Sequence, residues 1–150
     1  MIVRQSYIDQ ITPFIDMPFV KILTGVRRCG KSTILLMLMD ELKMRNICEN
    51  QIVRFNFDTL EWQNVDAKQV FKLVKAKLIP NKRTYLFLDE IQEIDHWERL
   101  VNTLMEEIEY DVDIFVTGSN YKMMSSEIST YLTGRYVSFR VHPLSFAEYL

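Results

Sequence analysis

The sequence predicts an α/β fold around a parallel sheet, and two observations lead to this expectation. Short runs rich in β-branched and aromatic residues alternate along the chain with longer segments of helical periodicity, which is the pattern of βα units. The length of 150 residues suits one domain, and a composition that is 48% hydrophobic and 25% charged can supply a core.

Apolar periodicity and stop signals predict five helices. Before the first strand, apolar residues recur at helical spacing until Pro18 stops the helix. Pro80 and Gly134 close two later helices, and Leu100 and Leu104 lie on one face of another. The expected helices span residues 4–15, 31–45, 67–78, 97–110 and 125–132.

Five strands are expected between these helices. Their sequences are either apolar almost throughout or alternate between apolar and polar residues, and Gly118 and Pro143 end the last two. The expected strands span residues 19–24, 52–57, 84–88, 113–117 and 136–141.

The last residues predict one more helix, with Ser145 as its N-cap and Glu148 at its third position. The chain ends inside this helix. We therefore expect residues 1–150 to be the N-terminal portion of a longer protein with a further C-terminal domain; a short terminal helix is the alternative.

Composition argues against several functional classes. The formal net charge of −2 gives no general basic character, so charge does not indicate nucleic-acid binding. The longest apolar run, 34–39, is far shorter than the roughly 20 residues that cross a bilayer, so we expect no membrane association. Cys29 and Cys48 have no metal-ligand spacing, and reduced thiols in a cytoplasmic protein are expected.

Residues 25–32, Gly-Val-Arg-Arg-Cys-Gly-Lys-Ser, match the phosphate-binding pattern G-x-x-x-x-G-K-S at every specified position. Glycines allow the backbone to curl closely around an anion, and the following helix adds its positive end and free N–H groups. Lys31 is expected to reach the β- and γ-phosphates of ATP, Ser32 to bind Mg²⁺, and Thr33 to contact the α-phosphate. The expected nucleotide-binding residues are Gly25, Val26, Arg27, Arg28, Cys29, Gly30, Lys31, Ser32 and Thr33.

The strand 84–88 leads directly into two carboxylates, Asp89 and Glu90. Ligands of open α/β sheets bind at the carboxyl ends of the strands, so Asp89 is expected to hold Mg²⁺ opposite Ser32. Glu90 is expected to orient the water that attacks the γ-phosphate, which requires the chain to leave the strand at that residue. This glutamate indicates a hydrolase, because a kinase must exclude water.

The strand 113–117 also ends in small polar residues, Ser119 and Asn120. Either side chain can hydrogen-bond the lytic water or the γ-phosphate. Both also suit the N-cap of the following helix, and the local sequence leaves the two roles evenly balanced.

Together these residues resemble AAA+ ATPases of the additional-strand, catalytic-glutamate type, specifically the bacterial and archaeal AAA ATPases with a C-terminal nuclease-like domain. The resemblance implies a P-loop NTPase fold of three α/β/α layers, in which the strand 113–117 lies between those at 19–24 and 84–88. The segments that carry it are residues 23–32, 88–92, 116–120, 132–135 and 143–149.

The resemblance also implies residue roles and partners. Asn120 is expected to sense the γ-phosphate, and Arg135 falls where such families place an arginine finger that acts on a neighbouring subunit. A ring or dimer is therefore implied, with ATP hydrolysis coupled to movement of a partner or of the C-terminal domain, and with nucleic acid or protein as the substrate. The lid domain of these families is missing from the sequence, which puts full turnover by this fragment in doubt.

Three other functions are alternatives to an ATPase. A GTP-binding switch lacks support, because Thr84 replaces the aspartate of a guanine-reading motif at 81–84. A small-molecule kinase needs an arginine-rich lid, and only Arg135 and Arg140 are available late in the chain. A nucleotide-gated interaction module with little hydrolysis is the main alternative to an ATPase.

Overall fold

The computed structural model describes residues 5–26, 30–106, 111–119 and 135–142, and the structural statements below concern these residues. The five strands are β1 (Val20–Thr24), β2 (Ile52–Asn56), β3 (Arg83–Asp89), β4 (Asp111–Gly118) and β5 (Tyr136–Arg140). The α-helices are α1 (Gln5–Ile11), α2 (Lys31–Met44), α3 (Ala67–Lys75) and α4 (Trp97–Met105).

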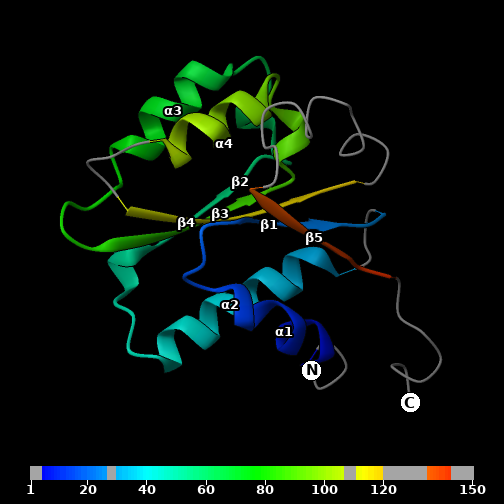
Figure 1. Ribbon diagram of the computed structural model, residues 1–150. Helices are drawn as coiled ribbons and strands as arrows, with labels where there is room; N and C mark the ends of the chain where they lie inside the picture. The colour runs from blue at the N-terminus through cyan, green and yellow to red at the C-terminus, as the bar shows by residue number, and fades with distance from the viewer. Residues whose placement is uncertain (1–4, 27–29, 107–110, 120–134, 143–150) are drawn as a thin grey trace.

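The strands form one sheet in the order β2-β3-β4-β1-β5, and every pair in it is parallel. β4 lies between β1 and β3, as the family resemblance implies. The helices α3 and α4 cover one face of this sheet, and α1 and α2 cover the other (Figure 1). The expected three-layer α/β/α fold with a five-stranded parallel sheet is confirmed.

Both faces of the sheet bury side chains, and β3 shows the alternation clearly. Leu86 and Leu88 belong to the core on the side of α3 and α4. Tyr85 and Phe87 belong to the core that contains the apolar residues of α1 and α2. The next residue in this second series is Asp89, so it leaves the sheet on the face that α2 covers.

The first helix is shorter than expected. It ends at Ile11, and a 3₁₀ turn over Thr12–Phe14 with Pro13 near its start replaces the last α-helical turn. Pro13 explains the early end of the α-helix, because its ring nitrogen carries no N–H donor and the ring crowds the preceding turn. α3 ends at Lys75 instead of residue 78, and the helices expected at 125–132 and beyond 145 lie outside the described residues.

A buried ion pair that the sequence did not reveal links β1 to β4. The ammonium of Lys21, which is 0% exposed, donates to Asp113 Oδ1, and it also donates to Met17 O at 2.9 Å. The backbone N–H of Asp16 donates to Asp113 Oδ2 at 2.9 Å. Burial raises the pKa of Asp113 although Lys21 opposes this, and burial lowers the pKa of Lys21 although Asp113 opposes that.

A second polar group continues from this pair along the same edge of the sheet. Tyr85 donates through its hydroxyl to Asp16 Oδ1 at 2.6 Å, and Arg83 donates to Asp16 and to Asp111, each at 2.9 Å. Burial alone would raise the pKa of Asp16, but the hydrogen bonds from Tyr85 and Arg83 outweigh it and lower that pKa. Burial and the bond to Asp16 raise the pKa of Tyr85.

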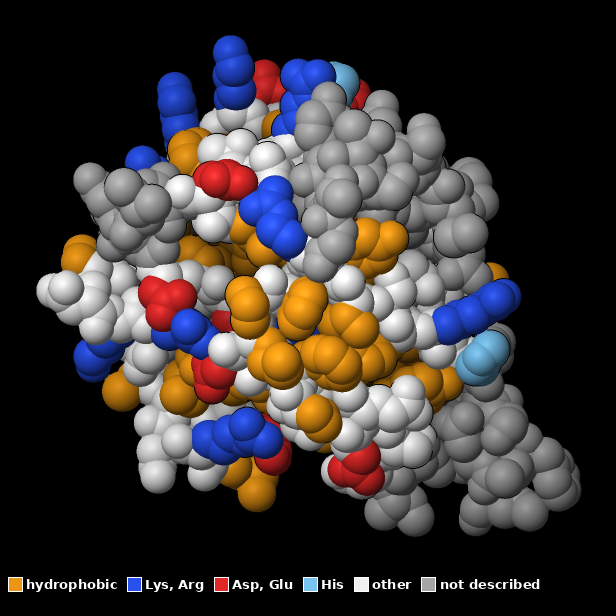
Figure 2. Space-filling view, in the orientation of Figure 1, with side chains coloured by type: hydrophobic (Ala, Val, Ile, Leu, Met, Phe, Trp, Pro, Cys, Tyr) orange, Lys and Arg blue, Asp and Glu red, His pale blue; other side chains and the backbone are white. Residues whose placement is uncertain are grey.

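The surface is mixed in character. On the face shown in Figure 2, hydrophobic side chains gather across the middle at the level of the sheet, and charged side chains of both signs surround them. No helix within the described part of the chain is both long and apolar enough to span a bilayer.

Candidate nucleotide-binding site

The connection from β1 to α2 has the geometry of a phosphate-binding turn at the two ends that the structure describes. Gly25 follows the last residue of β1, and its N–H donates to Gly118 O of β4 at 3.3 Å. Gly30 precedes α2 with φ 98° and ψ 14°, a left-handed conformation that would cost a residue with a Cβ ~1 kcal/mol or more. Its carbonyl accepts the N–H of Ile34 at 3.0 Å, so the helix begins at once.

Lys31 is the first residue of α2, and its side chain turns back over the loop. The ammonium donates to Gly25 O at 2.7 Å and to Val26 O at 3.0 Å, and it lies 3.6 Å from Glu90 Oε1. The side chain is only 3% exposed. A nearly desolvated positive charge therefore lies at the junction of the loop, the helix and the acidic strand.

Asp89 at the end of β3 lies beside Ser32, as expected. Ser32 Oγ donates to Asp89 Oδ2 at 2.7 Å, so the start of α2 and the end of β3 meet directly. Thr117 of β4 donates to Asp89 Oδ1 at 2.6 Å, and Arg54 Nη2 of β2 donates to Oδ2 at 2.8 Å. The carboxylate is 1% exposed, and these three donors satisfy both of its oxygens.

The register of the sheet explains why these donors converge. Arg54 pairs with Phe87 across β2 and β3, and directly paired strand residues project to the same face. Phe87 and Asp89 are two residues apart and share that face, which α2 covers. On β4, Phe115 packs in the same core, so Thr117 projects to this face as well.

Glu90 lies where the chain leaves β3, and it has the left-handed angles φ 56° and ψ 50°. Its N–H donates to Thr117 Oγ1 at 2.8 Å, which holds the backbone in this turn. Its carboxylate faces Lys31 through Oε1 and accepts Gln92 Nε2 at Oε2 at 2.6 Å. The departure from the strand that the glutamate requires is therefore present.

These groups border a hollow of about 280 Å³ in front of α2, lined by Gly30, Lys31, Ser32, Thr33 and Glu90. No cluster of three or more His, Cys, Asp or Glu side chains in the described segments could hold a metal by itself. The Ser32 hydroxyl and the Asp89 carboxylate are hard oxygen donors of the kind that suits Mg²⁺, which is usually bound by few protein ligands together with substrate phosphates. The donor set therefore fits a magnesium ion that arrives with a nucleotide.

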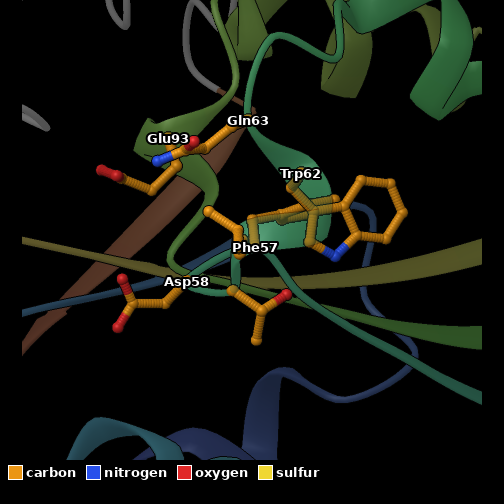
Figure 3. Close-up of a pocket in the computed structure, with 7 residues that line it drawn as sticks. Phe57, Asp58, Trp62, Gln63 and Glu93 are labelled. Carbon is orange, nitrogen blue, oxygen red and sulfur yellow. The ribbon is translucent and has the colours of Figure 1, made fainter.

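A second hollow of about 220 Å³ lies next to the acidic turn (Figure 3). Phe57, Asp58 and Trp62 from the segment after β2 line it, together with Glu93 from the turn after β3. Phe57 N–H donates to Asp89 O at 2.9 Å, so the wall of this hollow is joined to the end of β3.

Four of the expected site residues, Arg27, Arg28, Cys29 and Asn120, lie outside the described residues.

Arg135 lies at the amino end of β5, where its carbonyl accepts Val20 N–H. Its guanidinium contacts Asn102 and donates to Glu106 at 2.9 Å, at the end of α4. Because β5 has 5 residues, roughly 17 Å of strand at ~3.3 Å per residue separates it from the site edge.

Two residues that contact Asp89, Arg54 and Thr117, were not predicted from the sequence. The sequence gives some indication of a role for Arg54, because it is the one charged residue in the strand Ile-Val-Arg-Phe-Asn. The indication for Thr117 is weaker, because it is only a polar residue near the end of an apolar strand. Neither signal says which carboxylate the side chain reaches, since that depends on strand order and register.

The strand order and the loop-to-helix turn at the end of β1 define a P-loop nucleoside triphosphatase fold. Residues 18–150 match the family described as AAA domain, so the chain belongs to the AAA domain family. It is an AAA-type P-loop ATPase domain.

Two curated relatives are described as uncharacterized proteins. The chain is 39% identical over 152 residues to an uncharacterized protein of Haemophilus influenzae, and 32% identical over 131 residues to one of Methanocaldococcus jannaschii. The alignments cover 100% and 87% of this chain but 38% and 28% of those proteins. The chain thus spans well under half of their length.

Solved structures share the fold at low identity. A DNA polymerase III gamma subunit-related protein from Thermotoga maritima superposes with a TM-score of 0.63 at 15% identity, covering 94% of this chain and 47% of that one. A chain of Drosophila ORC bound to DNA gives a TM-score of 0.58 at 10% identity, covering 96% and 93%. Likeness at these identities shows the architecture alone.

Proposed function

We propose that this domain binds ATP together with Mg²⁺ and hydrolyses it. The observation that carries the proposal is the 2.7 Å hydrogen bond from Ser32 Oγ to Asp89 Oδ2. It places a hydroxyl at the start of α2 beside a buried carboxylate, and Lys31 lies one residue before that hydroxyl. This arrangement suits a triphosphate and its metal.

The position of each residue in the fold assigns it a separate role in binding or hydrolysis. N–H groups at the start of α2 and the Lys31 ammonium bind the phosphates, which requires the ammonium to exchange its bonds to Gly25 O and Val26 O for phosphate oxygens. Ser32 and Asp89 would hold the Mg²⁺, and the ion would neutralise charge on the phosphates. Glu90 orients water and accepts its proton, and Asn120 contacts the γ-phosphate.

A nucleotide-gated switch with little hydrolysis is the second candidate, and one contact favours it. The Glu90 carboxylate is engaged at Oε2 by Gln92 and faces Lys31 at Oε1. These contacts fix the direction of the carboxylate and reduce its basicity toward water, so turnover would be slow until a partner or second subunit changes the turn.

The wider role of the protein is also part of the proposal. Arg135 lies far from the site of its own chain, which supports action on the nucleotide of a neighbouring subunit. Hydrolysis would then be coupled to movement of a partner, with nucleic acid or protein as the substrate. The expected C-terminal nuclease-like domain stays a prediction.

Calorimetry with ATP and Mg²⁺, combined with measurement of phosphate release, tests this function. Lys31→Ala is expected to abolish detectable binding, because charge-assisted hydrogen bonds of ~1.5–3 kcal/mol each are lost. Glu90→Gln is expected to keep binding and to lower phosphate release by a factor of at least ~100. If Lys31→Ala bound ATP with unchanged affinity, Lys31 would not be a phosphate ligand. If Glu90→Gln released phosphate as fast as the unmodified chain, the nucleotide-gated switch would be favoured.

A further inference from the structure

We propose that Arg54 is a resident counter-ion of Asp89 that competes with Mg²⁺ and thereby sets the metal concentration at which the nucleotide site fills. This inference rests on the proposed function. It concerns the one described cation, apart from the site lysine, that lies against the carboxylates of the site.

The contact is direct and sterically defined. Arg54 Nη2 donates to Asp89 Oδ2 at 2.8 Å, and Ser32 Oγ donates to the same oxygen at 2.7 Å. The other oxygen, Oδ1, is taken by the neutral hydroxyl of Thr117. The guanidinium therefore places a full positive charge directly on the Asp89 carboxylate.

Burial explains why a charge at this place matters. Asp89 is 1% exposed, and an ionised carboxylate at that depth is costly unless a cation accompanies it. Arg54 supplies that cation from the middle of an otherwise apolar or neutral strand. The Arg54 side chain itself is 29% exposed, so it is only partly withdrawn from solvent.

The same charge opposes a metal ion at the site. A divalent ion held by Ser32 and Asp89 would meet the guanidinium at the same carboxylate, and like charges that share one partly buried partner repel appreciably. Arg54 therefore holds the Asp89 carboxylate in place before metal arrives, and it raises the Mg²⁺ concentration needed afterwards. Arg54 and Ser32 both donate to Oδ2, so a metal ion held between Ser32 and Asp89 would compete with the guanidinium for this carboxylate.

The test measures binding of a fluorescent, non-hydrolysable ATP analogue as a function of free Mg²⁺, so no turnover is required. Arg54→Gln keeps a hydrogen-bond donor and removes the charge, and Arg54→Lys keeps the charge. Arg54→Gln is expected to lower the half-saturating Mg²⁺ concentration on the order of tenfold, whereas Arg54→Lys stays close to the unmodified chain. Thermal unfolding without metal is expected at a lower temperature in Arg54→Gln, because Asp89 then lacks a counter-ion.

Arg83→Gln is the matched control. Arg83 begins β3 at the opposite edge of the sheet, is 31% exposed and also pairs with carboxylates, so its loss destabilises the fold without touching the site. The half-saturating Mg²⁺ concentration of the Arg83→Gln variant should equal that of the unmodified chain.

Each remaining outcome overturns a different idea. An unchanged or higher Mg²⁺ requirement in Arg54→Gln would refute the competition and leave Arg54 as a structural support. Equal loss of analogue binding with and without Mg²⁺ would make Arg54 a phosphate ligand instead. Absence of any Mg²⁺-dependent binding in the unmodified chain would refute the proposed function, and this inference with it.

Discussion

Thr117 on β4 donates through its hydroxyl to Asp89 Oδ1 at 2.6 Å, and the same oxygen of Thr117 accepts the N–H of Glu90 at 2.8 Å. One hydroxyl thus holds the side chain of the first carboxylate residue and the backbone of the second. The geometry of the site consequently depends on a strand that contributes neither the loop nor the carboxylates.

Thr117→Val is expected to damage both stability and metal-dependent binding. Valine preserves the shape but leaves a buried N–H of Glu90 and one oxygen of Asp89 without a partner, which costs ~1–3 kcal/mol of unfolding free energy. Urea denaturation and Mg²⁺-dependent nucleotide binding measure the two effects. Thr103→Val, on the exposed side of α4, is the control and should cost less than ~0.5 kcal/mol.

Lys21→Met is expected to be strongly destabilising, by ~3–5 kcal/mol, because it leaves Asp113 buried without its cation. The double variant Lys21→Met with Asp113→Asn should recover most of this loss, since asparagine stays neutral and still accepts the Asp16 N–H. Denaturant unfolding of both variants measures the difference. Equal destabilisation of the single and double variants would mean that the ion pair itself stabilises the fold.

Tyr85→Phe is expected to change how stability responds to alkaline pH. Burial and the bond to Asp16 raise the pKa of Tyr85 above the value of about 10 for an unfolded chain. The protonated phenol therefore adds to the unfolding free energy, and this contribution is fully present below pH ~10. As pH rises from there toward the folded pKa, the unfolded chain loses the proton first, and the unfolding free energy falls by up to ~1.4 kcal/mol per pH unit. Unfolding free energies measured from pH 8 to 11 should fall less steeply in Tyr85→Phe, and parallel curves would contradict the assignment.

Arg135→Ala is expected to leave ATP affinity unchanged and to lower phosphate release at protein concentrations that permit assembly. The reason is distance, because Arg135 lies at the amino edge of the sheet while Ser32 and Asp89 lie at the carboxyl edge. Phosphate release measured across a range of protein concentrations checks this. Arg45→Ala, which removes another surface arginine paired to a carboxylate, is the control. A rate equal to that of the control would make Arg135 an ordinary surface residue.

Local signals predicted much of the fold. Each of the five strands appears where its apolar or alternating run indicates, and α2 begins at Lys31 directly after the glycine turn. The ends of the helices and strands are predicted less accurately, because Pro13 shortens the first helix and tertiary contacts lengthen β4 by a residue or two at each end. These are adjustments at boundaries, where propensity competes with packing.

The sequence by itself determined the loop from Gly25 to Ser32 and the placement of Asp89 and Glu90 at a strand end, because these features depend on consecutive residues and on strand polarity. Only the tertiary structure decided that Arg54 and Thr117 both reach Asp89. Those side chains come from strands on either side of β3, and the order and register of a parallel sheet are set by burial on both faces and not by spacing along the chain.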